Sequence, residues 1–161
     1  MRENFRREIE YLLDEVPPEQ WQEPDICGVR YEFLPWHGMS SVTVQRAEDN
    51  PRDPAAWKHY FSAESDGSRI RAQIDLYDQT CETDELVYHR LLIEAAVAML
   101  EVDLGRHIPH MITTSGIGLY RPFQVQVHHS DRVFGFNYCE YVLARRLDAA
   151  EPGAAADGGG A

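Results

Sequence analysis

Residues 29–45 read VRYEFLPWHGMSSVTVQ, and this stretch decides the fold. Apolar and polar residues alternate over residues 29–33 and again over residues 42–45. Alternation with a period of two is typical of strands that bury one face, because successive side chains point to opposite sides of a strand. Residues 35–38, PWHG, supply a turn between the two runs. The stretch therefore predicts a β-hairpin.

Two further hairpins are predicted on the same reasoning. The first joins residues 57–64 to residues 68–77 through a turn that contains Gly67. The second covers residues 123–147, where an alternating apolar strand is followed by a polar turn and by aromatic and β-branched residues from Val133 onward. Because strands occur as hairpins and not singly between helices, an antiparallel sheet is favoured over a doubly wound parallel sheet.

Two helices complete the predicted fold. Five apolar side chains between Phe5 and Val16 share one helical face, and the prolines that follow end this helix. A second helix of about 20 residues is expected between Thr83, a predicted N-cap, and Gly105, a predicted stop. Its apolar residues cover most of the circumference, which is typical of a buried helix. The predicted class is α+β: an antiparallel sheet built from hairpins, with an N-terminal amphipathic helix and a long buried central helix packed on one face.

The length of 161 residues suits one domain. We expect a single α+β domain over residues 1–147 and a disordered Ala/Gly-rich tail over residues 148–161, which lack bulky apolar groups. The longest apolar run, residues 91–100, is too short to cross a bilayer. The N-terminal residues do not follow the pattern of a secretory signal. The sequence therefore predicts a cytoplasmic protein without membrane association.

The chain is strongly acidic, with a formal net charge of −12. Carboxylates gather without basic residues in residues 14–25 and 78–85. Such a field repels phosphate backbones, and no basic stripe with interleaved aromatic residues offsets it, so nucleic-acid binding is disfavoured. A basic protein is the natural complement, although acidity also suits a protein that needs charge only for solubility. The three cysteines are widely spaced and fit reduced thiols.

The densest group of potential ligands is His128, His129 and Asp131, which contains an H-x-D element. Some iron oxygenases take two of three ligands from such an element. No histidine follows His129, and His128 points to the opposite side of a strand, so we expect solvated histidines at a turn and no metal site. CxxC, HExxH, GxGxxG, GxxxxGK[ST] and GxSxG motifs are also absent from the sequence. No cofactor and no catalytic residue is predicted.

Partner-binding residues are predicted at two places. Trp36 and His37 lie at the tip of the first hairpin, where an exposed indole would be typical of a protein interface. The alternative is that Trp36 packs back onto the sheet. Gln124, Gln126 and His128 form the polar, outward row of the strand that begins the last hairpin. We expect this row to face a partner.

These features favour a non-catalytic, acidic protein-binding module. In size, acidity and order of elements the chain resembles the small bacterial binding proteins that act as secretion chaperones or as toxin-neutralising immunity proteins, with no signature motif matched. The alternative is a small-ligand-binding protein or enzyme with a pocket between sheet and helices, lined by Tyr120, His128, Tyr138 and Glu140. In a third hypothesis the edge of the 123–147 hairpin pairs with a second copy to form a homodimer.

Overall fold

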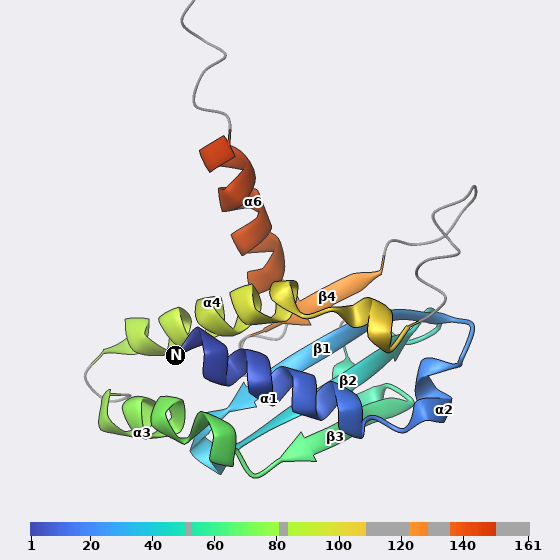
Figure 1. Cartoon of the computed structure of the whole chain (residues 1–161), viewed down its shortest axis with the longest axis horizontal. Helices are drawn as coiled ribbons and strands as arrows, with labels where there is room; N and C mark the ends of the chain where they lie inside the picture. Colours follow the sequence, from blue (N-terminus) through green and yellow to red (C-terminus); the bar gives the residue numbers. More distant parts are fainter. Residues whose placement is uncertain (51–52, 81–83, 109–122, 129–135, 151–161) are drawn as a thin grey trace, which may run out of the picture.

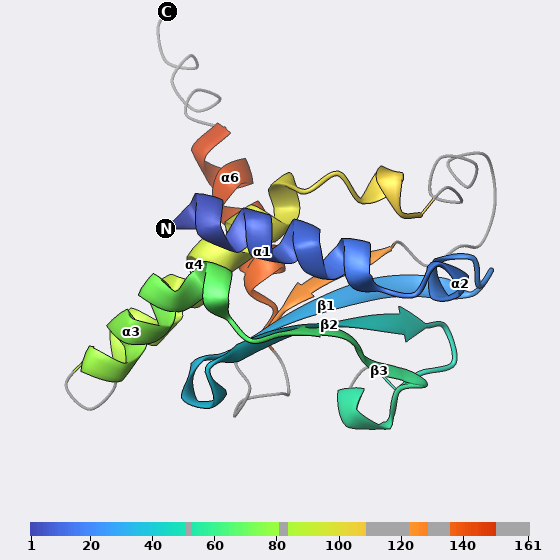
Figure 2. The same cartoon turned by 60° about the horizontal axis from the view of Figure 1, so that its bottom comes forward.

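A four-stranded sheet carries a layer of helices on one face in the computed structural model, which describes residues 1–50, 53–80, 84–108, 123–128 and 136–150 (Figures 1 and 2). The strands are β1 (Ile26–Leu34), β2 (Met39–Arg46), β3 (His59–Ser65) and β4 (Gln124–Val127). The helices are α1 (Arg2–Glu15), α2 (Pro18–Trp21), α3 (Arg71–Thr80), α4 (Glu85–Glu101) and α6 (Tyr138–Ala150). Four short 3-10 turns join them: η1 (Pro35–His37), η2 (Pro54–Ala56), η3 (Ser68–Ile70) and η4 (Leu104–Arg106).

The predicted hairpin over residues 29–45 is confirmed by β1 and β2. The two strands are antiparallel, with Tyr31 opposite Val42 and Val29 opposite Val44. The strand order is β3-β2-β1-β4, in which β3 runs antiparallel to β2 and β4 runs parallel to β1. The sheet is therefore mostly antiparallel, and the predicted α+β class is confirmed.

Helices α1 and α4 form the layer above the sheet, as Figure 2 shows. Phe5 of α1 meets Tyr31 and Phe33 of β1 edge-on, at ring-centroid distances of 6.3 and 5.3 Å. This edge-to-face geometry is the favourable arrangement of aromatic rings. Helix α4 begins one residue later than predicted, because the side chain of Asp84 accepts the Leu86 amide hydrogen at 2.9 Å. It ends at Glu101, where Val102 takes an extended conformation before Gly105 is reached.

The interface between α1 and the sheet also encloses a carboxylate, Glu8, which is fully buried. Its Oε1 accepts the hydroxyl of Ser40 on β2 at 2.6 Å, and Nη1 of Arg69 lies 3.7 Å from its Oε2. A buried carboxylate needs such partners, because desolvation strongly disfavours an isolated charge. These contacts fix α1 against β2 and η3.

The predicted strand over residues 68–77 is wrong, since η3 and α3 occupy this segment. Ile70 and Ile74 are buried, whereas Ala72 between them is exposed. A spacing of four is shared by strands, which repeat every two residues, and by helices, which repeat every 3.6. Ile70 and Ile74 therefore fit one helical face, whereas the exposed Ala72 does not fit the buried face of a strand.

The predicted hairpin over residues 123–147 is also wrong. Only β4 is a strand, the helix α6 begins at Tyr138, and residues 129–135 lie outside the described residues. Tyr138, Cys139 and Val142 are buried at helical spacing. Asn137 determines this start, because its Oδ1 accepts the Cys139 amide hydrogen at 3.0 Å in the manner of an N-cap.

Asn137 also covers the outer edge of β4. Its Nδ2 donates to the carbonyl oxygen of Val125 at 3.0 Å, and its Oδ1 accepts the amide hydrogen of Val127 at 3.2 Å. One side-chain amide thus makes the two hydrogen bonds that a neighbouring strand would make. Pairing of this edge with a second copy would have to displace Asn137.

Helix α6 extends away from the rest of the molecule (Figures 1 and 2). It continues to Ala150, three residues into the segment predicted as a disordered tail, and residues 151–161 lie outside the described residues. Leu143 and Leu147 are exposed on this helix. An ion pair of 3.7 Å between Arg146 and Glu101 joins α6 to α4.

Candidate protein-binding surface

Trp36 stands at η1, the turn between β1 and β2, and 39% of its surface is exposed. Its ring neither points freely into solvent nor lies on the sheet. It contacts Tyr77 of α3 and Tyr88 of α4, at centroid distances of 6.2 and 5.9 Å. Both alternatives for this residue are therefore partly met: the indole packs on two helices and still presents a face to solvent.

Phe33, Tyr77 and Tyr88 support Trp36, and we name these four residues the aromatic platform. Tyr77 and Tyr88 meet edge-on at 5.4 Å, and Tyr88 lies 6.2 Å from Phe33. The Tyr88 hydroxyl donates to the carbonyl oxygen of Phe33 at 3.2 Å. Phe33 and Tyr88 belong to the core. The exposed indole of Trp36 therefore packs on aromatic side chains that are part of the hydrophobic core or in contact with it.

Two glycines set the position of the platform. Gly38 closes η1 with a left-handed φ of 64°, and Gly67 adopts a φ of 67° at the turn before η3. A Cβ on Gly67 would lie 2.5 Å from the carbonyl oxygen of Gly38. The β1–β2 turn and the turn before η3 thus approach each other more closely than a side chain on Gly67 would allow.

A polar side chain contacts the platform, and two carboxylates lie on the helix that carries Tyr77. His37 is exposed, and its ring lies 6.0 Å from that of Trp36. Asp75 and Asp78 are exposed on α3, on either side of Tyr77 in sequence. An exposed aromatic ring beside carboxylates can contact apolar and cationic groups of a partner.

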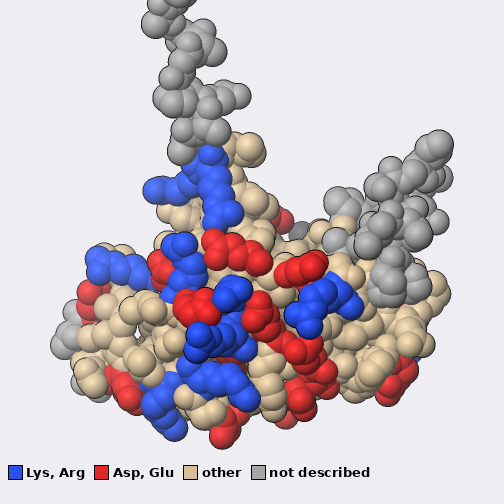
Figure 3. Space-filling model, in the orientation of Figure 1, with Lys and Arg blue, Asp and Glu red and all other residues tan. Residues whose placement is uncertain are grey.

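The basic residues of α1 are engaged in ion pairs with nearby carboxylates. Arg6 pairs with Glu3 at 2.9 Å and with Glu10 at 3.5 Å, and Arg7 pairs with Glu3 at 2.9 Å. Figure 3 shows acidic and basic side chains intermingled on this face of the molecule. This face does not offer a continuous basic surface.

The predicted polar row of β4 is placed differently from the expectation. Gln124 is exposed, but Gln126 is only 5% exposed and His128 is half-buried. Gln126 Nε2 donates to Gln45 Oε1 at 2.7 Å, and His128 Nε2 lies 3.2 Å from Gln126 Oε1. Burial, helped by the charge of Arg30, lowers the pKa of His128 to about 4. Of the three residues, Gln124 is exposed, His128 is half-buried and Gln126 is buried.

The same face of the sheet holds a buried ion pair. Arg30 is 2% exposed, and its Nη2 lies 2.9 Å from Glu32 Oε1. Burial lowers the pKa of Arg30, and the charge of Glu32 partly opposes this shift. The second face of the sheet therefore holds buried polar groups, among them Arg30, Glu32 and Gln126, and Gln126 contacts the half-buried His128.

The residues predicted to line a ligand pocket do not converge. The Tyr138 hydroxyl is hydrogen-bonded to Nδ1 of His89 on α4, within the helical layer. His128 lies on the other face of the sheet, bonded to Gln126. Glu140 is exposed on α6, and Tyr120 lies outside the described residues. The predicted pocket is thus not assembled by the residues that the structure describes.

No three His, Cys, Asp or Glu side chains come together in a way that could hold a metal ion, among the residues the structure describes. His129 and Asp131 of the H-x-D element lie outside that part of the chain.

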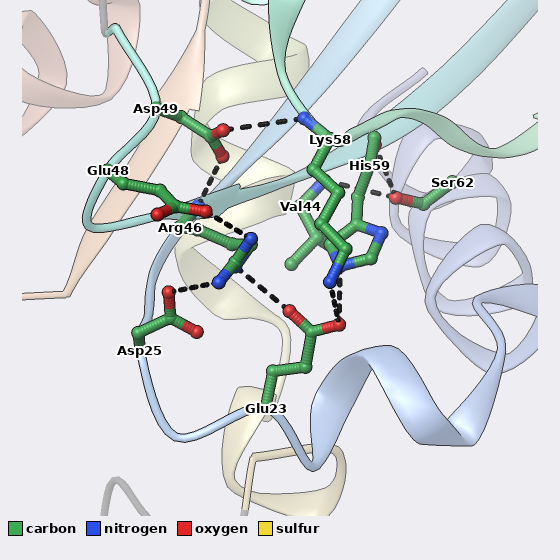
Figure 4. Close-up of polar contacts among 9 residues, drawn as sticks. All are labelled: Glu23, Asp25, Val44, Arg46, Glu48, Asp49, Lys58, His59 and Ser62. Carbon is green, nitrogen blue, oxygen red and sulfur yellow. Dashed lines mark hydrogen bonds and ion pairs between the residues drawn. The ribbon is translucent and has the colours of Figure 1, made fainter.

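An ion-pair cluster joins the start of β1 to β2 and β3, as Figure 4 shows. Glu23 lies 2.8 Å from Lys58, 3.0 Å from His59 and 3.0 Å from Arg46. The hydrogen bonds from Lys58 and His59 lower the pKa of Glu23 to about 2. Arg46 also pairs with Asp25, at 2.8 Å, and with Glu48. The sequence did not predict this cluster, because its members come from three separate segments of the chain. The ion pairs join these segments to one another.

A pocket of about 280 Å³ lies among the end of α1, α2 and η4. Trp21, Arg106 and His107 contribute to its lining, and His107 Nε2 is 3.6 Å from Asp14 Oδ1. Burial lowers the pKa of His107, although Asp14 opposes the shift.

A second, more apolar pocket of about 400 Å³ opens between α3, α4 and the first residue of the chain. We name it the α3–α4 groove. Its lining residues are Met1, Leu76, Val87, Arg90, Leu91, Ile93 and Glu94. The sequence feature that corresponds to this groove is the apolar circumference of α4. That feature alone predicts a buried helix and does not distinguish a groove from the core.

No protein-family model, curated protein or solved structure matches this chain. None of the helices in the described ranges combines the length and apolar character that crossing a bilayer requires.

Proposed function

We propose that this chain is a non-catalytic, acidic protein-binding module of the cytoplasm that holds a protein partner against the aromatic platform. The observation that carries the proposal is Trp36, whose indole is 39% exposed and supported by Tyr77 and Tyr88. Tryptophan is among the residues most enriched at the centres of protein interfaces. The contacts with Tyr77 and Tyr88 already restrict the Trp36 side chain, so little side-chain entropy is lost when a partner covers it.

The partner is proposed to be basic. The chain has a net charge of −12, and Asp75 and Asp78 are exposed on α3, the helix that carries Tyr77. Complementary charge speeds association and selects among partners. In this proposal the chain holds a basic polypeptide without changing it chemically. Secretion chaperones and immunity proteins, which the chain resembles in size, acidity and order of elements, are binding proteins of this kind.

The test begins with the untagged protein purified from its native host, and with the identification of whatever stoichiometric protein co-purifies. Binding of that protein is then measured by isothermal titration calorimetry for the parent, Trp36→Ala and Tyr60→Ala. Tyr60 is the matched control, because it is also 39% exposed but lies on β3. We expect Trp36→Ala to weaken binding about 30-fold, equivalent to roughly 2 kcal/mol, and Tyr60→Ala to leave it unchanged.

Two results would contradict the proposal. One is a protein that co-purifies with nothing and remains a monomer in size-exclusion chromatography. The other is clear stabilisation by a metabolite or nucleotide in a thermal-shift screen, since a ligand at 100 times its dissociation constant adds about 2.7 kcal/mol to stability. The second result would favour the small-ligand alternative.

A further inference from the structure

The outer edge of β4 has the features of a strand edge that accepts a further strand. Residues 124–127, QVQV, alternate polar and apolar side chains and carry neither a charge nor a proline. They pair with residues 28–31 of β1 in unbroken register. Folded proteins protect such edges by short strands, charged side chains, prolines, bulges or a covering element. Apart from its short length, β4 depends on the last of these.

The opposite edge of the sheet is protected in a different way. Residues 60–62 of β3 stand opposite the single residue Thr43 of β2, which makes a bulge. Side chains make hydrogen bonds there: the Phe61 amide donates to Thr43 Oγ1 at 3.2 Å, and Ser62 Oγ accepts the Val44 amide hydrogen at 3.2 Å. A bulge twists an edge strand away from regular pairing with another chain.

Asn137 occupies the outer edge of β4 in the manner of a parallel strand. In a parallel pair, one residue bonds to two residues of the neighbouring strand, which lie two positions apart. The Asn137 carboxamide does the same, because Nδ2 donates to the Val125 carbonyl oxygen at 3.0 Å and Oδ1 accepts the Val127 amide hydrogen at 3.2 Å. Oδ1 also accepts the Cys139 amide hydrogen, at 3.0 Å. One side chain therefore closes the edge of β4 and caps α6.

We propose that Asn137 is an autoinhibitory contact, which keeps the edge of β4 from pairing with β4 of a second copy. A net charge of −12 opposes self-association elsewhere on the surface, whereas residues 124–127 are uncharged and can face a second copy without repulsion. The N–H and C=O of one strand residue point to the same side, so the Val125 N–H lies on the outer edge together with the carbonyl that Asn137 binds. This surface is separate from the aromatic platform, and the proposal does not depend on the partner proposed there.

The first test is the variant Asn137→Ser. Serine caps a helix about as well as asparagine, but its hydroxyl is too short to bond both edge groups of β4. The substitution therefore keeps the cap of α6 and opens the edge. Sedimentation equilibrium measures self-association of the parent and the variant, and circular dichroism establishes that both fold. We expect Asn137→Ser to dimerise at least about tenfold more tightly than the parent, because two hydrogen bonds no longer have to break before the edges pair.

A matched pair of substitutions at Val125 locates the dimer contact. Val125→Pro removes the outward N–H without removing a hydrogen bond to β1, whereas Val125→Ala shortens the side chain and keeps the N–H. In the Asn137→Ser background, we expect Val125→Pro to return self-association to the level of the parent and Val125→Ala to leave the dimer intact. Amide hydrogen exchange gives a direct measurement, since the Val125 amide should become at least about tenfold more protected as the Asn137→Ser dimer forms.

The proposal is overturned if Asn137→Ser remains as monomeric as the parent, or if Val125→Pro and Val125→Ala affect the dimer alike. It is also overturned if Leu143→Glu/Leu147→Glu abolishes the Asn137→Ser dimer, because the exposed leucines of α6 would then form the contact. A dimer of the parent that Val125→Pro abolishes would overturn it as well, since the edge would then be open with Asn137 in place.

Discussion

Gly38 and Gly67 have nearly the same left-handed backbone, with φ of 64° and 67°, but different surroundings. A Cβ added to Gly38 meets nothing within 4 Å. A Cβ added to Gly67 would lie 2.5 Å from the Gly38 carbonyl oxygen and 2.6 Å from Cδ1 of Ile74. Replacing each glycine in turn with alanine therefore separates the free-energy cost of the backbone conformation from the cost of the close approach.

The two variants are expected to lose different amounts of unfolding free energy. A left-handed alanine costs about 1–2 kcal/mol, and the stiffer unfolded chain returns about 0.4–1 kcal/mol, which leaves roughly 1 kcal/mol for Gly38→Ala. Gly67→Ala loses the same roughly 1 kcal/mol and in addition about 1–3 kcal/mol through overpacking. The Gly38 carbonyl oxygen is part of the backbone and cannot rotate away from the new Cβ. The total expected for Gly67→Ala is roughly 2–4 kcal/mol.

Urea unfolding followed by far-UV circular dichroism measures this difference. With a typical dependence of 1–3 kcal/mol per molar urea, an extra loss of about 2 kcal/mol lowers the unfolding midpoint of Gly67→Ala by about 1 M relative to Gly38→Ala. Equal losses for the two variants would refute the reasoning, since the close approach would then carry no energetic weight. A larger loss for Gly38→Ala would refute it as well.

Three further predictions concern titrating groups and the edge of the sheet. The His128 imidazole binds a proton near pH 6.5 when unfolded and near pH 4 when folded, so stability falls by roughly 3 kcal/mol as the pH drops through this window; urea unfolding should show that His128→Gln flattens this loss, and an unchanged slope would contradict it. The pKa of Glu23 falls from 4.5 to about 2 on folding, so Glu23→Gln should melt below the parent at pH 7 and approach it as the pH falls from 4.5 towards 2; a constant gap in melting temperature would argue against this. Asn137→Ala removes the hydrogen bonds to Val125, Val127 and Cys139 and should cost about 1–3 kcal/mol in urea unfolding, with Asn137→Asp intermediate because it keeps the acceptor oxygen; a neutral Asn137→Ala would exclude an energetic role for these bonds.

The elements that could be predicted from sequence are those in which the local pattern and the tertiary burial agree. The alternation in residues 29–45 predicted β1 and β2, and the apolar face that includes Phe5 predicted α1. In both cases the apolar residues that define the period pack together into one hydrophobic core. A pattern of this kind is sufficient because a shift of one residue would turn every apolar side chain to the wrong face.

The errors arose where a pattern fits two periods or where the deciding contact is distant in sequence. Ile70 and Ile74 are spaced by four residues, which strands and helices share. The aromatic residues around Tyr138 favoured a strand by propensity, but packing against α4 makes this segment helical. The parallel pairing of Val29 with Val125 joins segments far apart in the chain, and no local pattern carries that information.

The candidate site was predictable only in part, for a related reason. The turn chemistry around Trp36 predicted a hairpin tip, and a hairpin tip exposes its side chains. The support from Tyr77 and Tyr88 depends on two helices whose placement the sequence did not reveal. Gln126 was expected to be accessible because the outer face of an antiparallel sheet is usually solvated. Its hydrogen bond to Gln45 instead places it in a buried polar network.

Helix α3 carries Tyr77 of the aromatic platform, and Trp36 lies at η1 between β1 and β2. Because α3 follows directly from η3, the close approach of Gly67 to Gly38 holds Tyr77 and Trp36 in position relative to each other.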